Sequence, residues 1–133
     1  MVGGGPQLEA LSRRYRQVHF TGPRQGEDLA RHYAAADVFV FPSRTDTFGL
    51  VLLEALASGV PVAAYPVPGP LDVVNGAGVG FLEEDLASAA RQALAISPEA
   101  CRRYALQFSW QRSAEQFLGN LQPFDPAINK PES

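Results

Sequence analysis

The stretch VFVFPSRTDTFGLVLLEALASGVPVAAY, residues 38–65, decides the fold of this chain. Its two continuously apolar runs, residues 38–41 and 61–65, are typical of strands buried in a parallel sheet. Between them, residues 47–58 predict an apolar helix, which Gly59 ends and which Pro61 prevents from continuing. The stretch therefore predicts a strand–helix–strand unit.

The same alternation extends over most of the chain. Residues 18–21 and, more weakly, 79–81 predict further strands, and helices are expected at residues 6–16, 27–35, 70–74, 86–95, 98–107 and 109–121. This order predicts an α/β fold, a Rossmann-like parallel sheet with helices on both faces. We expect one domain over residues 1–121 with a truncated first strand at its start. A disordered tail is expected at residues 122–133, which are proline-rich and lack periodicity.

Composition excludes several classes of function. The 133 residues carry a net charge of -3 with scattered basic residues, so no nucleic-acid-binding surface is indicated. Cys101 is the only cysteine, which excludes an internal disulfide and fits a reducing compartment. No apolar run approaches the roughly 18 residues of a membrane span. We expect a cytoplasmic protein that binds neither metal nor nucleic acid.

Glu54 is the first candidate functional residue, because it is the only ionisable side chain in residues 48–57. A buried, unpaired carboxylate costs several kcal/mol or gives up its charge, so a buried Glu54 should have a polar partner. A ligand hydroxyl would be such a partner. The alternative is a carboxylate on an exposed stripe of the helix.

Asp46 is the second candidate, and seven residues separate it from Glu54 in the sequence. If the helix begins beside Asp46, the two carboxylates lie about 12 Å apart along its axis, at roughly 1.5 Å per residue. This spacing suits two ends of one extended ligand. Alternatively, Asp46 is an ordinary N-cap residue that accepts hydrogen bonds from free backbone N–H groups.

Four glycine-containing segments are predicted to follow strands at the edge of the sheet where α/β proteins bind ligands. Phe48, Gly49 and Leu50 would form the first turn of the central helix, where backbone N–H groups can hold an anion. Gly49 could instead only permit tight packing. The turns at Gly3–Gly4 and Gly22–Pro23 match no dinucleotide or Walker pattern, and ordinary turns are the alternative, as for the loop at residues 68–70.

Other chemistry is not supported. His19 and His32 have no acidic or cysteine partner placed to activate them, and Ser43 lies outside any nucleophile-elbow pattern. We therefore expect neither a metal site nor serine hydrolase chemistry.

The motifs at residues 2–6, 20–22, 36–43 and 46–62 together resemble the C-terminal, donor-binding domain of retaining GT-B glycosyltransferases of the group 1 type. The resemblance extends over residues 2–121 and implies that Asp46 and Glu54 are the catalytic-site carboxylates. Asp46 would contact hydroxyls of the donor sugar, and Glu54 the ribose hydroxyls of its nucleotide. The remaining donor-site residues implied by the motifs are Phe48, Gly49 and Leu50 at the diphosphate, Gly22 and Pro23 at the base, and Gly3, Gly4 and Ser43.

The sequence departs from the family pattern in two respects. Asp46 replaces the more usual glutamate, and the basic residues and acceptor domain that precede this region in the family are not in the sequence. We expect a chain that binds a nucleotide sugar weakly, needs no cofactor and transfers nothing alone. Its acceptor is unknown and could be a glycan, a lipid or a small molecule. Any membrane association would involve only the acceptor domain. The alternatives are a non-catalytic interaction module or another nucleotide-sugar enzyme, such as an epimerase.

Overall fold

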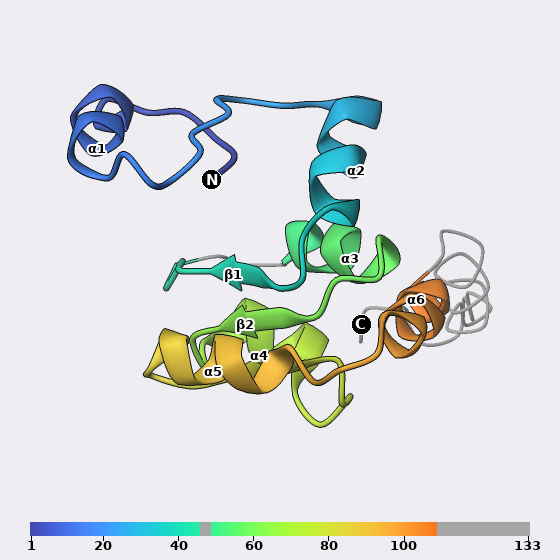
Figure 1. Cartoon of the computed structure of the whole chain (residues 1–133). Helices are drawn as coiled ribbons and strands as arrows, with labels where there is room; N and C mark the ends of the chain where they lie inside the picture. Colours follow the sequence, from blue (N-terminus) through green and yellow to red (C-terminus); the bar gives the residue numbers. More distant parts are fainter. Residues whose placement is uncertain (46–48, 109–133) are drawn as a thin grey trace, which may run out of the picture.

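A computed structural model describes residues 1–45 and 49–108 of the chain (Figure 1). The described elements are, in order, α1 (Leu8–Arg14), α2 (Gly26–Ala34), β1 (Phe39–Phe41), α3 (Leu50–Ala57), β2 (Val62–Ala64), α4 (Pro68–Val74), β3 (Gly80–Leu82), α5 (Leu86–Ala93), α6 (Pro98–Ala105) and a 3₁₀ turn, η1 (Leu106–Phe108). The helix expected at residues 109–121 and the tail expected at 122–133 lie outside the described residues.

The strands form a parallel sheet in the order β1-β2-β3, with Phe39 opposite Val62 and Val62 opposite Gly80. Every residue of β2 is buried, as expected for a central strand. Val62 and Ala64 join the core with α3, α4 and α6. Alternation turns Ala63 to the other face, which α5 covers with the fully buried Ala89 and Ala93. The predicted α/β class with helices on both faces is confirmed.

The hydrophobic core lies entirely in the second part of the chain. Its buried cluster extends from Leu52 on α3 to Cys101 on α6. Residues 1–45, in contrast, contain no buried side chain, and neither α1 nor α2 has a buried residue. Figure 1 shows α1 and the N-terminus set apart from the sheet and joined to α2 by an extended segment. The sheet and its helices are thus held by burial, whereas the N-terminal part is not.

Two local predictions were wrong. Residues 18–21 form no strand; the parallel pairing there is a single bridge between Val2 and Gly22, with hydrogen bonds from Gly3 N to Gly22 O and from Thr21 N to Met1 O, both 3.0 Å. Because no third described strand lies against this pair, the ladder stays one bridge long. Residues 68–70 are not a loop but the first turn of α4, with Gly69 and Pro70 buried. The weaker prediction at residues 79–81, in contrast, corresponds to β3.

The end of α3 follows the predicted pattern. Gly59 has φ +81°, and its N–H donates to Leu56 O while the N–H of Val60 donates to Ala55 O, both at 2.9 Å. These two bonds are those of a Schellman motif, which satisfies the last carbonyls of the helix. The buried Val60 then leads directly into β2. This turn fixes where α3 lies relative to the sheet.

Candidate functional site

Glu54 lies on the exposed side of α3, opposite the buried Leu52, Ala55 and Leu56. The expectation of a buried Glu54 was wrong, because the apolar residues of α3 that face the sheet are on the other side of the helix. Its carboxylate accepts a hydrogen bond from the Tyr33 hydroxyl, with 3.2 Å between Tyr33 Oη and Glu54 Oε2. The carboxylate is therefore held at the surface by a residue of α2, one turn of helix beyond the exposed Leu50.

The first turn of α3 is built around Gly49. Gly49 is buried, occupies the N-cap position with φ +65°, and accepts a hydrogen bond from Leu52 N at 2.9 Å. A Cβ atom there would lie 2.9 Å from Leu52 Cδ1 and 3.5 Å from Val73 Cγ2. Both the left-handed backbone and the lack of space require glycine. The backbone conformation and the tight packing are thus sufficient reasons for a glycine at this position.

The helix begins later than expected: α3 starts at Leu50, with Gly49 as its N-cap, rather than at residue 47. The N-cap alternative for Asp46 and its spacing to Glu54 stay predictions. Asp46 and Phe48 themselves lie outside the described residues. The backbone N–H groups of Leu50 and Val51 precede the first hydrogen bonds of the helix, which Leu52 N and Leu53 N donate to Gly49 O.

Ser43 lies in the turn that leaves β1. It is half-buried, and its hydroxyl oxygen accepts a hydrogen bond from Thr45 N at 3.4 Å. Arg44 beside it pairs with Glu84, at 2.7 Å between Nη2 and Oε2, and its guanidinium lies 3.7 Å from the centre of the Tyr65 ring. The hydrogen bond from Arg44 lowers the pKa of the Glu84 carboxyl below its usual range. These three side chains follow the carboxyl ends of β1, β2 and β3 and fasten the turn to the sheet edge.

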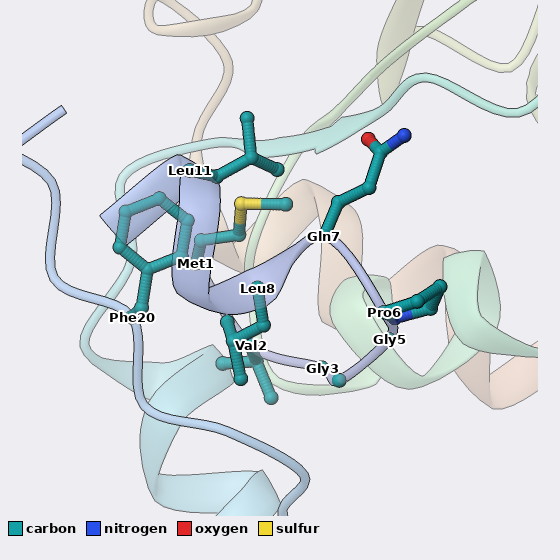
Figure 2. A pocket seen from close by; sticks show the side chains of 10 residues that line it. Met1, Val2, Gly3, Gly5, Pro6, Gln7, Leu8, Leu11 and Phe20 are labelled. Atoms are coloured by element: carbon teal, nitrogen blue, oxygen red, sulfur yellow. The ribbon is translucent and has the colours of Figure 1, made fainter. Parts of the chain in front are cut away.

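The four N-terminal candidates lie together. Gly3 and Gly22 are joined by the backbone pairing described above, and a Cβ on Gly4 would lie 3.1 Å from Pro23 Cγ. Beside them is a pocket of about 330 Å³ (Figure 2), lined by Met1, Val2, Gly3, Gly4, Gly5, Pro6, Gln7, Leu8, Leu11 and Phe20. Gln7 is the only polar side chain of this lining. The pocket is suited to apolar groups and brings no charged side chain to the glycines.

The predicted site residues thus form two groups. Gly3, Gly4, Gly22 and Pro23 make one; Ser43, Gly49, Leu50 and Glu54 make the other, at the carboxyl end of β1. The hydrogen bonds given above for these residues lie within the first group or join the second group to Tyr33, Thr45 and Leu52. The second group combines a carboxylate with the positive end of a helix, an arrangement that can bind hydroxyls and an anion.

Two further findings concern the same described residues. They contain no group of three or more His, Cys, Asp or Glu side chains placed to hold a metal ion. Nor does any of their helices combine the length and apolar character needed to cross a bilayer.

Comparison with known proteins identifies the class. The model of the family described as "Glycosyl transferases group 1" matches residues 1–97, so the chain belongs to this glycosyltransferase family. It is 41% identical to a D-inositol 3-phosphate glycosyltransferase of Corynebacterium aurimucosum, over 88% of this chain and 30% of that protein. It is 36% identical to a GDP-mannose-dependent alpha-mannosyltransferase of Mycobacterium tuberculosis, over 92% of this chain and 35% of that protein. The chain thus spans about a third of the length of these relatives.

Solved structures agree on the fold. The chain resembles sucrose-phosphate synthase from Thermosynechococcus elongatus with a TM-score of 0.67 and 32% identity, covering 89% of this chain and 36% of that one. It resembles the Anabaena protein HepE, solved in complex with UDP, with a TM-score of 0.69 and 25% identity, covering 89% and 40%. The resemblance to the group 1 GT-B glycosyltransferases is confirmed.

Sequence reasoning missed Tyr33 and the cluster of Arg44, Tyr65 and Glu84. Arg44, Tyr65 and Glu84 follow the ends of three neighbouring parallel strands, which meet at one edge of a sheet, and this signal was available in the sequence. Tyr33 carried no such signal. Its contact with Glu54 depends on how α2 packs on α3, which residue spacing does not predict.

Proposed function

We propose that this chain is the donor-binding half of a glycosyltransferase that transfers a hexose from a nucleotide-diphosphate sugar, with retention of configuration, to an acceptor that the other half binds. The observation that supports it most is the family match over residues 1–97 together with Glu54 exposed on an otherwise apolar helix that follows β1. Relatives named as GDP-mannose-dependent and a structural neighbour bound to UDP support a nucleotide-sugar donor.

In this proposal the described residues bind and orient the donor. Glu54 accepts hydrogen bonds from the ribose hydroxyls, because an ionised carboxylate accepts bonds in two directions. The N–H groups that begin at Leu50 bind the diphosphate at the positive end of α3. This anion stabilisation is needed when the nucleotide diphosphate leaves. By the family resemblance, Asp46 contacts the sugar, the Gly22–Pro23 turn lies against the base, and Gly3 and Gly4 belong to the same donor site.

The isolated chain should bind the donor weakly and transfer no measurable sugar, because transfer of this kind takes place in a cleft between two domains from which water is excluded. A cytoplasmic location fits the single free cysteine, Cys101, which is buried. We propose that the donor half uses no cofactor besides its nucleotide-sugar substrate.

Titration of the 133-residue chain with UDP, GDP and their hexose conjugates, followed by amide chemical shifts, tests the proposal. We expect shifts around Ser43, Leu50 and Glu54, and Glu54→Gln should weaken binding about tenfold or more, as expected for lost hydrogen bonds to a charged group. Glu99→Gln on α6 is the matched control, since it removes one exposed carboxylate elsewhere and should change nothing. Absence of shifts with every nucleotide would favour a non-catalytic interaction module.

A further inference from the structure

Tyr33 is the side chain that links α2 to the candidate carboxylate. It is the second-last residue of α2, and its half-buried ring packs edge-on against Phe39 of β1, with centroids 5.4 Å apart at 68°. Its hydroxyl passes beyond this contact to Glu54 Oε2, at 3.2 Å. Burial, together with the charge of Glu54 and this hydrogen bond, raises the pKa of Tyr33 to about 12. The phenol is therefore a neutral hydrogen-bond donor at physiological pH.

Glu54 needs such a partner if it is to bind a ligand well. An exposed glutamate side chain has three rotatable bonds and loses much of its rotamer freedom when it is fixed on a ligand. In the described parts of the chain, the Tyr33 hydroxyl is the one side-chain group that hydrogen-bonds to the Glu54 carboxylate. This bond engages Oε2; among the described residues no side chain donates a hydrogen bond to Oε1. A partner that fixes the carboxylate beforehand lowers the entropy that binding costs.

The anchoring of Tyr33 suits this role. Its ring rests on Phe39, which in turn stacks on Phe41 of the same strand, with centroids 6.0 Å apart. The position of the hydroxyl is thus set by the sheet rather than by α2 alone, which has no buried residue. A tyrosine anchored in this way can hold the exposed Glu54 carboxylate in one position.

We propose that Tyr33 is a positioning residue for Glu54: through its hydrogen bond to one carboxylate oxygen, it presents the other to the ribose hydroxyls of a nucleotide. The inference rests on the proposed donor-binding function and deepens it. Tyr33 itself touches no ligand in this arrangement, so its effect on binding must pass entirely through Glu54.

The test compares Tyr33→Phe with Tyr104→Phe in the 133-residue chain. Tyr104 is a matched control, because its hydroxyl also makes one hydrogen bond, to Val73 O at 2.7 Å, on a different part of the core. The probes are UDP and 2′,3′-dideoxy-UDP. Tyr33→Phe should weaken UDP binding about three- to tenfold, the range of one lost hydrogen bond, and leave dideoxy-UDP binding unchanged. Tyr104→Phe should change neither.

A double-mutant cycle completes the test. In a Glu54→Gln background, Tyr33→Phe should have less effect than in the wild type, because two groups that act through one bond are not additive. An equal loss for both probes, or a full Tyr33→Phe effect in the Glu54→Gln background, would show that Tyr33 acts by supporting the fold and would overturn the proposal.

A readout without nucleotide separates failure of this inference from failure of the proposed function. The ¹³Cδ resonance and side-chain couplings of Glu54 should change in Tyr33→Phe and stay unchanged in Tyr104→Phe. If the wild type binds no nucleotide, the donor-binding proposal fails on its own terms. If Glu54 is equally ordered with and without the Tyr33 hydroxyl, the positioning role fails even where nucleotide binds.

Discussion

Residues 1–35 and residues 49–108 are held together by different interactions. Residues 49–108 contain the whole buried cluster, from Leu52 to Cys101. Residues 1–35 contain no buried side chain, and their only strand-like pairing is one bridge between Val2 and Gly22. Both belong to the matched family region, which covers residues 1–97. The comparison shows that a region can match the family model where burial does not hold it in place.

This difference divides the candidate site. Glu54 and Leu50 are on a helix that packs on the sheet, while the Gly3–Gly4 and Gly22–Pro23 turns depend on backbone hydrogen bonds. Regions with few buried contacts open at lower free energy than the core. We therefore expect the two groups of site residues to differ in local stability.

The largest effect should follow from truncating the core. Leu52→Ala removes a fully buried side chain and should lower the free energy of unfolding by about 2–5 kcal/mol, the range of buried leucine truncations. Leu11→Ala in α1, where the side chain is only half-buried, should cost about 1 kcal/mol or less. Urea unfolding followed by circular dichroism measures both. Equal losses would show that α1 is as well packed as α3 and would remove the contrast.

Two glycines sharpen the comparison, because both have positive φ but different surroundings. Gly49→Ala adds left-handed strain of about 1–2 kcal/mol to a contact of 2.9 Å with Leu52, so the total should reach about 2–4 kcal/mol. Gly22→Ala carries only the strain, since no atom beyond Gly22 and its two chain neighbours lies within 4 Å of the added Cβ. The same unfolding experiment measures this difference, and a larger loss at Gly22 would contradict it.

The sequence predicted the structure of residues 49–108 better than that of residues 1–35, for a physical reason. Apolar runs such as residues 61–65 and the stop at Gly59 are read directly from residue types, and β2 and the end of α3 followed. Residues 18–21 have an equally strand-like composition, yet a strand needs a neighbour, and composition does not report one. The exposure of Glu54 and its contact with Tyr33 likewise depend on how helices pack.

A smaller effect on stability should come from improving the N-caps of α1 and α2 in residues 1–35. Gln25, the N-cap residue of α2, has an extended backbone but makes no side-chain cap, so Gln25→Ser should stabilise α2 locally by about 0.5–1 kcal/mol. Gln7 before α1 has a helical backbone, and Gln7→Ser should gain little. Hydrogen exchange of the α1 and α2 amides measures both. Slowed exchange throughout residues 49–108 as well would show that the two regions unfold together.

The smallest effect concerns the ion pair that fastens the turn after β1 to the edge of the sheet. Arg44 lowers the pKa of Glu84, so the charged carboxylate favours the folded state. The stabilisation is present above the usual carboxyl pKa near 4.5 and is lost as the pH falls through the lower folded-state value. Glu84→Gln should therefore be slightly less stable than the wild type at pH 7 and equal to it in acid. In an Arg44→Gln background the same substitution should show no such pH dependence, since the effect requires the guanidinium; a difference that persists there would place its origin elsewhere than at this turn.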